Sequence, residues 1–467
     1  MNREGPIVEE LSPPPDAEQA FLRLRGLPHC LWLDSALKHA TLGRYSFLTA
    51  DPFDYLELAV SDRGAFEQLG RRISELCAPA APGVPPFQGG AAGLFSYELA
   101  QQLERLPAPR SDEFQIPALA VGFYDVVLAW DHVQNRAWLI SHGLPAPTGS
   151  RRRRAAERIA QFRDWLAGPP QPVHRRCRSQ SLTRDELAPQ FRVGDIPDLT
   201  SNFSRDAYMQ AVEQAIDYIA AGDIFQVNLS QRLLHPAHGD AAELYFRLRR
   251  RNAATFAGYF DLGAFQIASA SPERFLQLHD RQVEARPIKG TRRRTRLAEA
   301  DLFAGDELRA SEKDRAENVM IVDLLRNDLA RVCQPESVHV TQLCELESYE
   351  FVQHLVSAVR GTLADDRQPL DLLRAAFPGG SITGAPKVRA MEIIAELEPT
   401  ARGAYCGALG YLGFDGTMDT NILIRTVTAG RGWWQFPVGG GVVAQSEPAL
   451  EYDETWHKAE GLLRALR

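Results

Sequence analysis

Three features are scarce in this sequence, and each absence narrows what the protein can be. No apolar run approaches a membrane span, and residues 1–6 lack the apolar core of a signal peptide. The six cysteines show no CxxC spacing, which favours buried thiols in a reducing compartment. Excess positive charge is also missing, since the formal net charge of -8 argues against nucleic acid as the main partner. We therefore expect a cytoplasmic protein that does not enter a membrane.

The apolar fraction is ordinary, 45% of 467 residues, so a sizeable core can form. This length suits about two to three average domains or one large intertwined unit. The stretch 171–200 is rich in Pro, Arg and Ser, and we interpret it as a linker. It would separate an N-terminal region, 1–170, from a catalytic domain, 201–467. Four arginines at 151–154 are interpreted as a solvated helix start, with nucleic-acid contact as the weaker alternative.

Apolar spacing and turn residues predict the main elements. One helix has clear boundaries, with Ser204 as a plausible N-cap and Gly222 after its last turn. Strands gather into groups with helices between the groups, which favours the α+β class over a parallel sheet. The predicted helices are 151–166, 204–222, 312–331, 350–360, 385–397 and 447–465, and the predicted strands are 117–128, 136–141, 226–234, 258–271, 282–288, 408–413 and 419–428.

Lys289 is the most informative single residue, because it is a lone amine on a short apolar strand that ends at Gly290. An apolar setting and the positive charge of Arg292, Arg293 and Arg294 would lower the lysine pKa and make the amine a nucleophile. A glycine there would let a ligand or another backbone come close. The alternative is a solvated surface lysine.

Two predicted helices carry carboxylates on one face. Asp314 and Glu317 are three residues apart in the first helix, and Glu447, Glu451 and Glu454 follow helical spacing in the second. One acidic face is typical of a solvated helix. If both faces met in one pocket, they would repel unless a cation lay between them. Oxygen ligands without His or Cys favour Mg²⁺ over zinc.

Anion-binding features follow further along the chain. The Gly-rich loop 378–387 leads into a predicted helix, whose backbone N–H groups attract a carboxylate or phosphate, although a tight loop is the alternative. Arg425 lies on an otherwise apolar predicted strand and needs an anion or acid there. Tyr411 on the preceding strand could share that anion, and the glycines 439–441 could let a ligand reach the backbone.

Glu273 follows a strand end and could be a general acid if it is desolvated. An ion pair with Arg274 or Arg286 is the alternative. His354, taken alone, is interpreted as a core histidine. Cys406 is interpreted as core, since its neighbours lack the small-residue elbow of a glutaminase nucleophile.

In this order along the chain, these features resemble the chorismate-utilising enzymes. The resemblance spans about residues 202–465 and is looser in the N-terminal half. It implies two antiparallel β-sheets packed as a sandwich with helices on the outside. The stretches that carry it are 224–230, 270–275, 285–291, 317–329, His354, 379–387, Tyr411, Arg425 and 447–454, and more loosely 33–35, 43–46 and 90–97.

The resemblance also implies roles at the matching positions. Glu317 and Glu454 would hold Mg²⁺, with Asp314 and Glu451 close behind, and the metal would grip the ring carboxylate of chorismate. Glu273 would protonate the departing C4 hydroxyl. The remaining implied substrate contacts are His354 at the ring, Tyr411, Arg425 and Gly440 at the enolpyruvyl carboxylate, and Thr383, Gly384, Lys458 and Gln226 around them.

Two positions choose among family members. Isochorismate and salicylate synthases carry a lysine base where Gln226 stands, so water addition is disfavoured here. Anthranilate synthases generally have alanine where Lys289 stands. At this position the sequence resembles the aminodeoxychorismate synthases instead. That likeness implies attack of the amine at C2, amination at C4 and a role in 4-aminobenzoate and folate biosynthesis. The alternatives are an anthranilate synthase with an unusual lysine and a non-catalytic paralogue that binds chorismate.

The sequence contains no glutaminase motif, so ammonia is expected from a partner glutamine amidotransferase subunit or from ammonium. Conversion of the product to 4-aminobenzoate is expected to need a separate lyase. Relatives have an N-terminal tryptophan pocket, in which Ser35 would meet the amino group. They usually carry proline near Thr255, and its absence here disfavours tryptophan binding.

Overall fold

The computed structural model describes residues 5–172, 180–294, 298–348 and 352–466. All strand pairs within these ranges are antiparallel, and they form two sheets. In order across the first sheet lie β1 (Ile7–Leu11), β8 (Arg136–Ser141), β7 (Val126–Asp131), β3 (Tyr45–Thr49), β2 (Leu31–Asp34), β12 (Phe256–Asp261), β13 (Phe265–Ser271), β22 (Thr426–Gly430), β23 (Trp433–Val442), β11 (Gln226–Pro236), β10 (Thr200–Ser201) and β9 (Phe191–Arg192), and β19 (Gly384–Ala385) pairs with β11.

The second sheet carries Lys289, and Glu273 lies directly before one of its strands. In order it contains β16 (Ile288–Arg293), β18 (Val352–Thr362), β15 (Gln282–Ala285), β14 (Arg274–His279), β21 (Met418–Asn421), β20 (Ala408–Gly413), β5 (Gly90–Phe95), β6 (Leu119–Tyr124) and β4 (Asp54–Leu58), and β17 (His339–Ser348) also pairs with β18. The helices are α1 (Ala17–Leu24), α2 (Ala65–Ser74), α3 (Thr148–Ala167), α4 (Arg205–Ala220), α5 (Ala241–Arg251), α6 (Ala298–Ala310), α7 (Glu312–Ala330), α8 (Pro369–Ala376), α9 (Lys387–Leu397) and α10 (Pro448–Leu466), with short 3₁₀ turns η1 (Tyr97–Gln102), η2 (Arg184–Glu186) and η3 (Gly380–Ile382).

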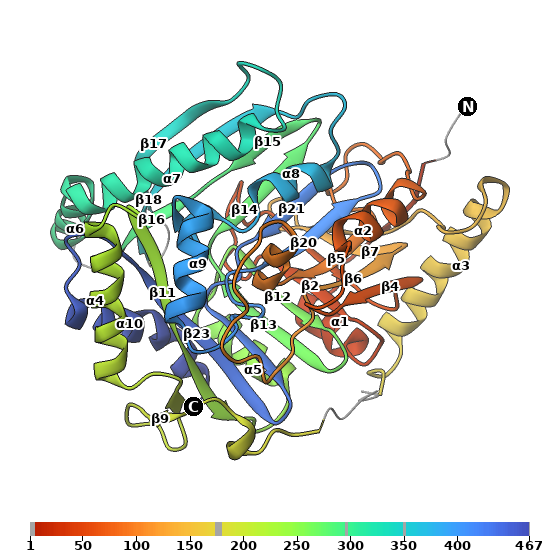
Figure 1. Ribbon diagram of the computed structural model, residues 1–467. Coiled ribbons are helices and arrows are strands. Elements are labelled where there is room, and N and C mark those ends of the chain that lie inside the picture. Colours follow the sequence, from red (N-terminus) through yellow and green to blue (C-terminus); the bar gives the residue numbers. More distant parts are fainter. Residues whose placement is uncertain (1–4, 173–179, 295–297, 349–351, 467) are drawn as a thin grey trace.

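The sheets pack face to face, with helices on their outer sides, which confirms the predicted α+β sandwich (Figure 1). One apolar cluster between the sheets joins side chains from both, such as Phe260 and Ile267 of the first with Leu94 and Leu409 of the second. Side chains of α1, α5 and α10 pack in a second cluster, and those of α2, α7 and α9 in a third. Burying both sheet faces requires this layered arrangement.

Both sheets contain strands from the two halves of the chain in adjacent blocks, which meet where β2 pairs with β12 in the first sheet and where β5 pairs with β20 in the second. The three-part division of the chain stays a prediction. The helix 204–222 is confirmed as α4, and the Ser204 hydroxyl accepts a hydrogen bond from the Ala207 N–H at 3.1 Å. The helices 312–331, 385–397 and 447–465 are also confirmed, as α7, α9 and α10.

Three predicted strands are each two strands. The stretch 117–128 divides at Asp125 into β6 and β7, and 419–428 divides into β21 and β22. Each of these divisions passes the chain from one sheet to the other. The stretch 258–271 turns back at Gly263, whose φ of 91° suits glycine, and forms the hairpin of β12 and β13. Continuous apolar character hid these breaks, because strands in a sandwich are buried throughout.

The predicted helix 350–360 is wrong. Residues 349–351 lie outside the described ranges, and Val352–Thr362 forms strand β18 between β15 and β16. Its valines, Val352, Val356 and Val359, lose side-chain freedom in a helix and favour a strand. The correction places His354 on the sheet beside Lys289.

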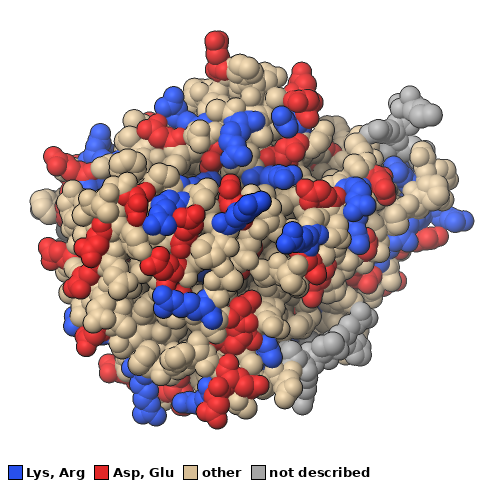
Figure 2. All heavy atoms as spheres, in the orientation of Figure 1, with Lys and Arg blue, Asp and Glu red and all other residues tan. Residues whose placement is uncertain are grey.

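The expectations for cysteine burial and for membrane-spanning segments can be compared with the structure. Cys30, Cys333, Cys344 and Cys406 are buried as expected, but Cys77 is exposed, and Cys177 lies outside the described residues. Within the described ranges, every helix is too short or too polar to cross a bilayer. On the face drawn in Figure 2, basic and acidic side chains are intermixed.

Candidate active site

Lys289 lies in β16, against α7 and the loop that contains η3. Its Nζ is 3.7 Å from Glu317 Oε2 and donates a hydrogen bond to the Ser381 carbonyl oxygen at 3.3 Å. The pairing of β16 with β18 shifts register between Lys289 and Thr291, and Gly290 between them has φ of 72°. Such a bulge redirects a side chain out of the regular ladder. The lysine is therefore held by the backbone at the edge of a polar site.

The prediction that Lys289 lies in apolar surroundings is wrong. Its side chain is 13% exposed and lies among carboxylates, because the Glu317 side chain contacts it and Glu273 interacts with its charge. Gly290 admits Asp314, whose Cγ lies 3.0 Å from where a Cβ on that glycine would stand. The side chains of Arg292 and Arg293 lie outside the described parts, and Arg294 is exposed.

Glu273 is a buried carboxyl, 4% exposed, in the tight connection between β13 and β14. The Ser381 hydroxyl donates a hydrogen bond to its Oε1 at 2.9 Å. Burial raises the pKa of Glu273 to about 7, although Ser381, Lys289 and Arg425 each act to lower it. The side chain can therefore hold a proton at neutral pH, as a general acid must.

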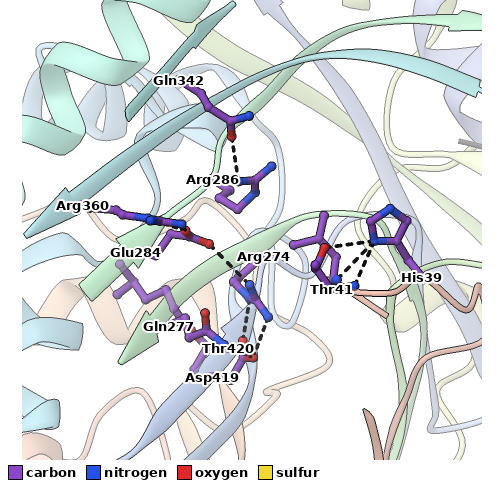
Figure 3. Close-up of polar contacts among 12 residues, drawn as sticks. His39, Thr41, Arg274, Gln277, Glu284, Arg286, Gln342, Arg360, Asp419 and Thr420 are labelled. Atoms are coloured by element: carbon purple, nitrogen blue, oxygen red, sulfur yellow. Dashed lines mark hydrogen bonds and ion pairs between the residues drawn. The ribbon is translucent and has the colours of Figure 1, made fainter. Parts of the chain in front are cut away.

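The alternative of a structural ion pair at Glu273 is wrong. Arg274 instead binds Asp419 at 3.0 Å and lies 3.6 Å from Glu284, as Figure 3 shows. Arg286 donates to Gln342 at 2.8 Å and pairs with Glu347. Among the described residues, neither arginine bonds Glu273. The charges that act on Glu273 are therefore those of Lys289 and Arg425.

His354 and Arg425 stand beside Glu273 and Lys289. His354 is 3% exposed in β18, and burial, followed by the charge of Arg425, lowers its pKa to about 4, so its ring is neutral. Arg425 was expected within a strand, but it lies in the connection between β21 and β22, with φ of 51°. Burial lowers the Arg425 pKa while Glu273 acts to raise it. No described residue forms an ion pair or side-chain hydrogen bond with this guanidinium, which leaves it available to an anion.

The two acidic helix faces converge as expected. Lys313 of α7 lies 3.2 Å from Glu451 Oε1 of α10, and Glu317 and Glu454 are close enough to affect each other's protonation. Burial raises the pKa of Glu317. Burial would also raise the pKa of Glu454, but Lys458, Lys313 and Lys289 together lower it. Each carboxylate is therefore matched by an amine.

Gly440 of β23 faces the same cluster. A Cβ there would stand 3.3 Å from Glu451 Oε2, 3.4 Å from Glu454 Oε1 and 3.5 Å from Lys458 Nζ. The Lys458 amine donates to the Gly439 carbonyl oxygen at 2.9 Å and pairs with Glu454 at 2.6 Å. Glycine thus leaves a space between backbone, carboxylates and amine. Glu447, the first acid in the series, is exposed.

These carboxylates fit a magnesium ion in type and partly in placement. Within the described ranges, no three His, Cys, Asp or Glu side chains lie close enough together to hold a metal. Mg²⁺ commonly binds only one or two protein carboxylates, with water and substrate completing its shell. Glu451 Oε2 is buried without a hydrogen-bond partner in the described structure and faces Gly440. This oxygen is therefore available as a metal ligand. Glu451 and Glu454, with Glu317 opposite, would hold the ion.

The Gly-rich loop bends back as η3 and β19 before α9. The Thr383 hydroxyl donates to the Gly379 carbonyl oxygen at 2.9 Å, and Gly384 has φ of 142° against the backbone of Gln226. Lys387 is used structurally, since its amine binds Asp328 at 2.6 Å. The Gln226 side chain donates to Glu317 Oε2 at 3.3 Å, which points it into the site.

One predicted substrate contact, Tyr411, packs away from the active site. The Tyr411 ring stacks on Phe87, with 4.3 Å between ring centroids, and its edge meets Phe47 in the cluster between the sheets. None of its contacts in the described structure reaches Arg425. Ser35, predicted for a separate tryptophan pocket, lies in the N-terminal half, where its hydroxyl donates to the Tyr45 carbonyl oxygen at 2.5 Å; its role in tryptophan binding stays a prediction.

Sequence reasoning missed Ser381 and Lys313. Ser381 bonds both Lys289 and Glu273, and Lys313 joins the two acidic helices. Ser381 stood inside the loop already singled out, so its hydroxyl was a visible signal. Lys313 precedes Asp314 on the helix, and its direction was not visible from spacing alone.

Lys289, Glu273 with its raised pKa, Arg425 without a described ion-pair partner and the paired carboxylates lie together, an arrangement that suits a small anionic substrate. The chain belongs to the chorismate-binding enzymes, because the model of that family, described as chorismate binding enzyme, matches residues 29–464. Both the fold and the converged site residues agree with this membership.

Relatives within the family carry two different names. The chain is 43% identical to aminodeoxychorismate synthase component 1 of Klebsiella aerogenes, over 82% of this chain and 78% of that protein. It is 39% identical to the protein of the same name from Salmonella typhimurium, over 100% and 99%. It is also 42% identical to anthranilate synthase component 1 of Thermus thermophilus, over 82% and 79%.

A solved structure supports the same family and fold. The crystal structure of anthranilate synthase component I from Streptococcus pneumoniae TIGR4 has a TM-score of 0.74 and 29% identity, covering 91% of this chain and 93% of that one. The chain is therefore a chorismate-converting enzyme by family, and identity alone does not separate the two activities.

Proposed function

We propose that this chain is component 1 of an aminodeoxychorismate synthase. It converts chorismate and ammonia to 4-amino-4-deoxychorismate, on the route to 4-aminobenzoate and folate. A glutamine amidotransferase partner supplies the ammonia, in keeping with the "component 1" in the names of the relatives. The observation that carries this proposal is the placement of Lys289 beside Glu273, both bonded to Ser381.

The proposed chemistry uses two linked displacements. The Lys289 amine attacks C2 with its nitrogen lone pair, both ring double bonds shift, and the C4 hydroxyl leaves as water with a proton from Glu273. Ammonia then attacks C4, the double bond shifts back, and the C2–nitrogen bond to Lys289 breaks. One proton from the ammonia nitrogen returns to Glu273 and restores the acid. The pyruvyl group is retained throughout.

The surrounding residues bind and orient the substrate in this proposal. Arg425 pairs with the enolpyruvyl carboxylate, because its guanidinium forms no ion pair with a described residue, although the charge of Glu273 acts on it. Neutral His354 lines the ring without adding charge. Glu451, Glu454 and Glu317 would hold magnesium, whose charge would offset the carboxylates and attract the ring carboxylate. Gln226 cannot act as a base toward water, which leaves amination favoured.

A second candidate is anthranilate synthase component 1, favoured by the 42% identity to the Thermus thermophilus protein. That activity places nitrogen at C2 and releases pyruvate, and it leaves no use for a lysine at position 289. Separating the products by mass after incubation with chorismate, ammonium and Mg²⁺ decides between the two. 4-Amino-4-deoxychorismate with pyruvate retained is expected. Anthranilate with released pyruvate would replace the proposal with the second candidate.

A further inference from the structure

A small cavity lies between η1 and α9, apart from the residues assigned to the active site. Its volume is about 30 Å³, enough for one or two water-sized molecules and too small for chorismate. It reaches the surface at Pro107, which is exposed. Its polar lining consists of Tyr97, Glu98, Gln101, Glu398, Thr400 and Arg402.

Two buried polar atoms at this cavity have no hydrogen-bond partner among the described residues. Glu98 is 5% exposed, and its Oε1 accepts a hydrogen bond from the Arg402 N–H at 2.8 Å. Its Oε2 and the Tyr97 hydroxyl are buried without a hydrogen-bond partner anywhere in the described residues. An unpartnered buried carboxylate oxygen is costly. The missing partner is therefore a small molecule that donates hydrogen bonds.

The charges around the cavity favour a cation over neutral water. The only described cation that lines it is Arg402, and Glu398 neutralises this guanidinium with contacts of 2.6 and 2.9 Å. Glu98 is left without a countercharge, and the nearby carboxylate of Asp112 adds negative charge. Burial, followed by Asp112, raises the pKa of Glu98 to about 8, so the carboxylate accepts a proton readily and attracts a cation only above about pH 8.

The cavity is linked to the catalytic loop through Arg402. This side chain donates to the Ile382 carbonyl oxygen at 2.9 Å and to that of Asn228 at 2.6 Å. The neighbour of Ile382 is Ser381, which bonds both Lys289 and Glu273. Arg402 thus connects the cavity to the loop whose Ser381 bonds the two proposed catalytic groups.

We propose that this cavity is an ammonium-binding site, in which Glu98 binds NH₄⁺ and takes one proton to release neutral ammonia toward Lys289 and Glu273. One N–H bond breaks, its electrons remain on nitrogen as the lone pair, and the proton forms an O–H bond at Glu98 Oε2. Water at the Pro107 side removes that proton. The inference rests on the proposed function only in that ammonia is a substrate, whichever carbon receives it.

The test compares the wild type with Glu98→Gln, which keeps an oxygen to accept the Arg402 N–H. Chorismate consumption is followed against ammonium concentration, so either aminated product counts. Loss of one hydrogen bond to a charged group predicts that the KM for ammonium rises about tenfold or more at about pH 8.5. The KM for chorismate stays within about twofold. Because Glu98 ionises near 8, the ratio of the two ammonium KM values falls toward one near pH 6.

Two further variants refine this result. Asp112→Asn removes a charge that raises the Glu98 pKa. The pH above which Asp112→Asn has a lower ammonium KM than the Asp112→Asn/Glu98→Gln double variant should therefore lie below the corresponding pH for the wild type and Glu98→Gln. Glu104→Gln removes an exposed carboxylate outside the cavity lining and leaves the ammonium KM unaltered. Equal ammonium KM values for Glu98→Gln and wild type at both pH values would assign only water to the cavity. A rise for Glu104→Gln equal to that for Glu98→Gln would assign the effect to a general loss of negative charge and overturn the role of Glu98.

A binding measurement removes any dependence on turnover. At matched ionic strength near pH 8.5, ammonium chloride is expected to raise the Tm of the wild type but not that of Glu98→Gln. Tetramethylammonium chloride, which is too large for the cavity and donates no N–H bond, is expected to raise neither. Equal stabilisation of both proteins by ammonium would overturn the site, while the identity of the product tests the proposed function separately.

Discussion

Glu273→Gln should inactivate the enzyme and stabilise it in a pH-dependent way. Burial raises the pKa of Glu273 from 4.5 to about 7, so the folded state holds this proton more tightly than the unfolded state. Folding stability therefore falls as pH rises from about 4.5 to about 7 and stays lower above that. At about 1.4 kcal/mol per pH unit, the wild type loses about 3 kcal/mol that a neutral glutamine retains.

The assay is thermal unfolding of both proteins across pH. For 467 residues, an unfolding entropy of about 2 cal/mol/K per residue converts about 3 kcal/mol into about 3 °C. The Tm of Glu273→Gln should exceed that of the wild type by about 3 °C at pH 8 and by under about 1 °C at pH 5. Activity should fall by a factor of about 10² to 10⁴ because the general acid is lost.

Two controls separate burial from a general loss of charge. Glu213→Gln removes an exposed carboxylate of α4 and should give no such pH-dependent difference. Ser381→Ala removes the hydroxyl that favours the charged form of Glu273, and it should move the alkaline fall in kcat/KM to higher pH. A Tm difference between Glu273→Gln and wild type that is constant from pH 5 to pH 8 would refute the reasoning.

Three further predictions concern the substrate, the metal and the N-terminal half. Lys289→Ala should bind chorismate but form aminated product at under about one hundredth of the wild-type rate, as measured in steady state; an unchanged rate would exclude the covalent role. Glu317→Gln and Glu454→Gln should abolish the Mg²⁺ dependence of activity together with most of the activity, and full wild-type activity after chelation would exclude the ion. A thermal-shift titration with tryptophan should give no stabilisation, whereas a concentration-dependent rise in Tm would show a working pocket near Ser35.

The site residues that the sequence predicted best are those in short contiguous motifs. Lys289, Glu273 and Glu317 each stand where local pattern and residue chemistry agree, and the structure brings all three together. The predicted substrate contact of Tyr411 was wrong because successive side chains of a strand point to opposite faces of the sheet. Its side chain enters the core between the sheets against Phe87, and the sequence contains no signal for which face that is.

The fold was less visible from sequence where the chain passes between sheets. Arg425 has φ of 51°, a conformation that a non-glycine residue adopts only when tertiary contacts hold it. The break that it makes between β21 and β22 could not be predicted from a run of apolar residues. The strand Val352–Thr362 was mistaken for a helix for a related reason, since short apolar runs fit both periodicities.

Glu98 could not be predicted as a functional residue from the sequence, for a third reason. Its segment matched the family pattern only loosely, and a lone glutamate after an aromatic residue has no distinctive chemistry in sequence. Only the packing of η1 against α9 and Arg402 leaves its Oε2 buried without a donor. Such a group can be found only once the enclosing elements are in place.

The covalent role of Lys289 is the central claim, and the mass of the intact protein tests it most directly. The enzyme is mixed with chorismate and Mg²⁺ in the absence of ammonia, quenched rapidly and compared with Lys289→Ala. The account predicts an added mass of chorismate less one water on the wild type, located on the peptide that contains Lys289, and none on the variant. Formation of 4-amino-4-deoxychorismate by a wild type that never gains this mass, or equal added mass on Lys289→Ala, would contradict it.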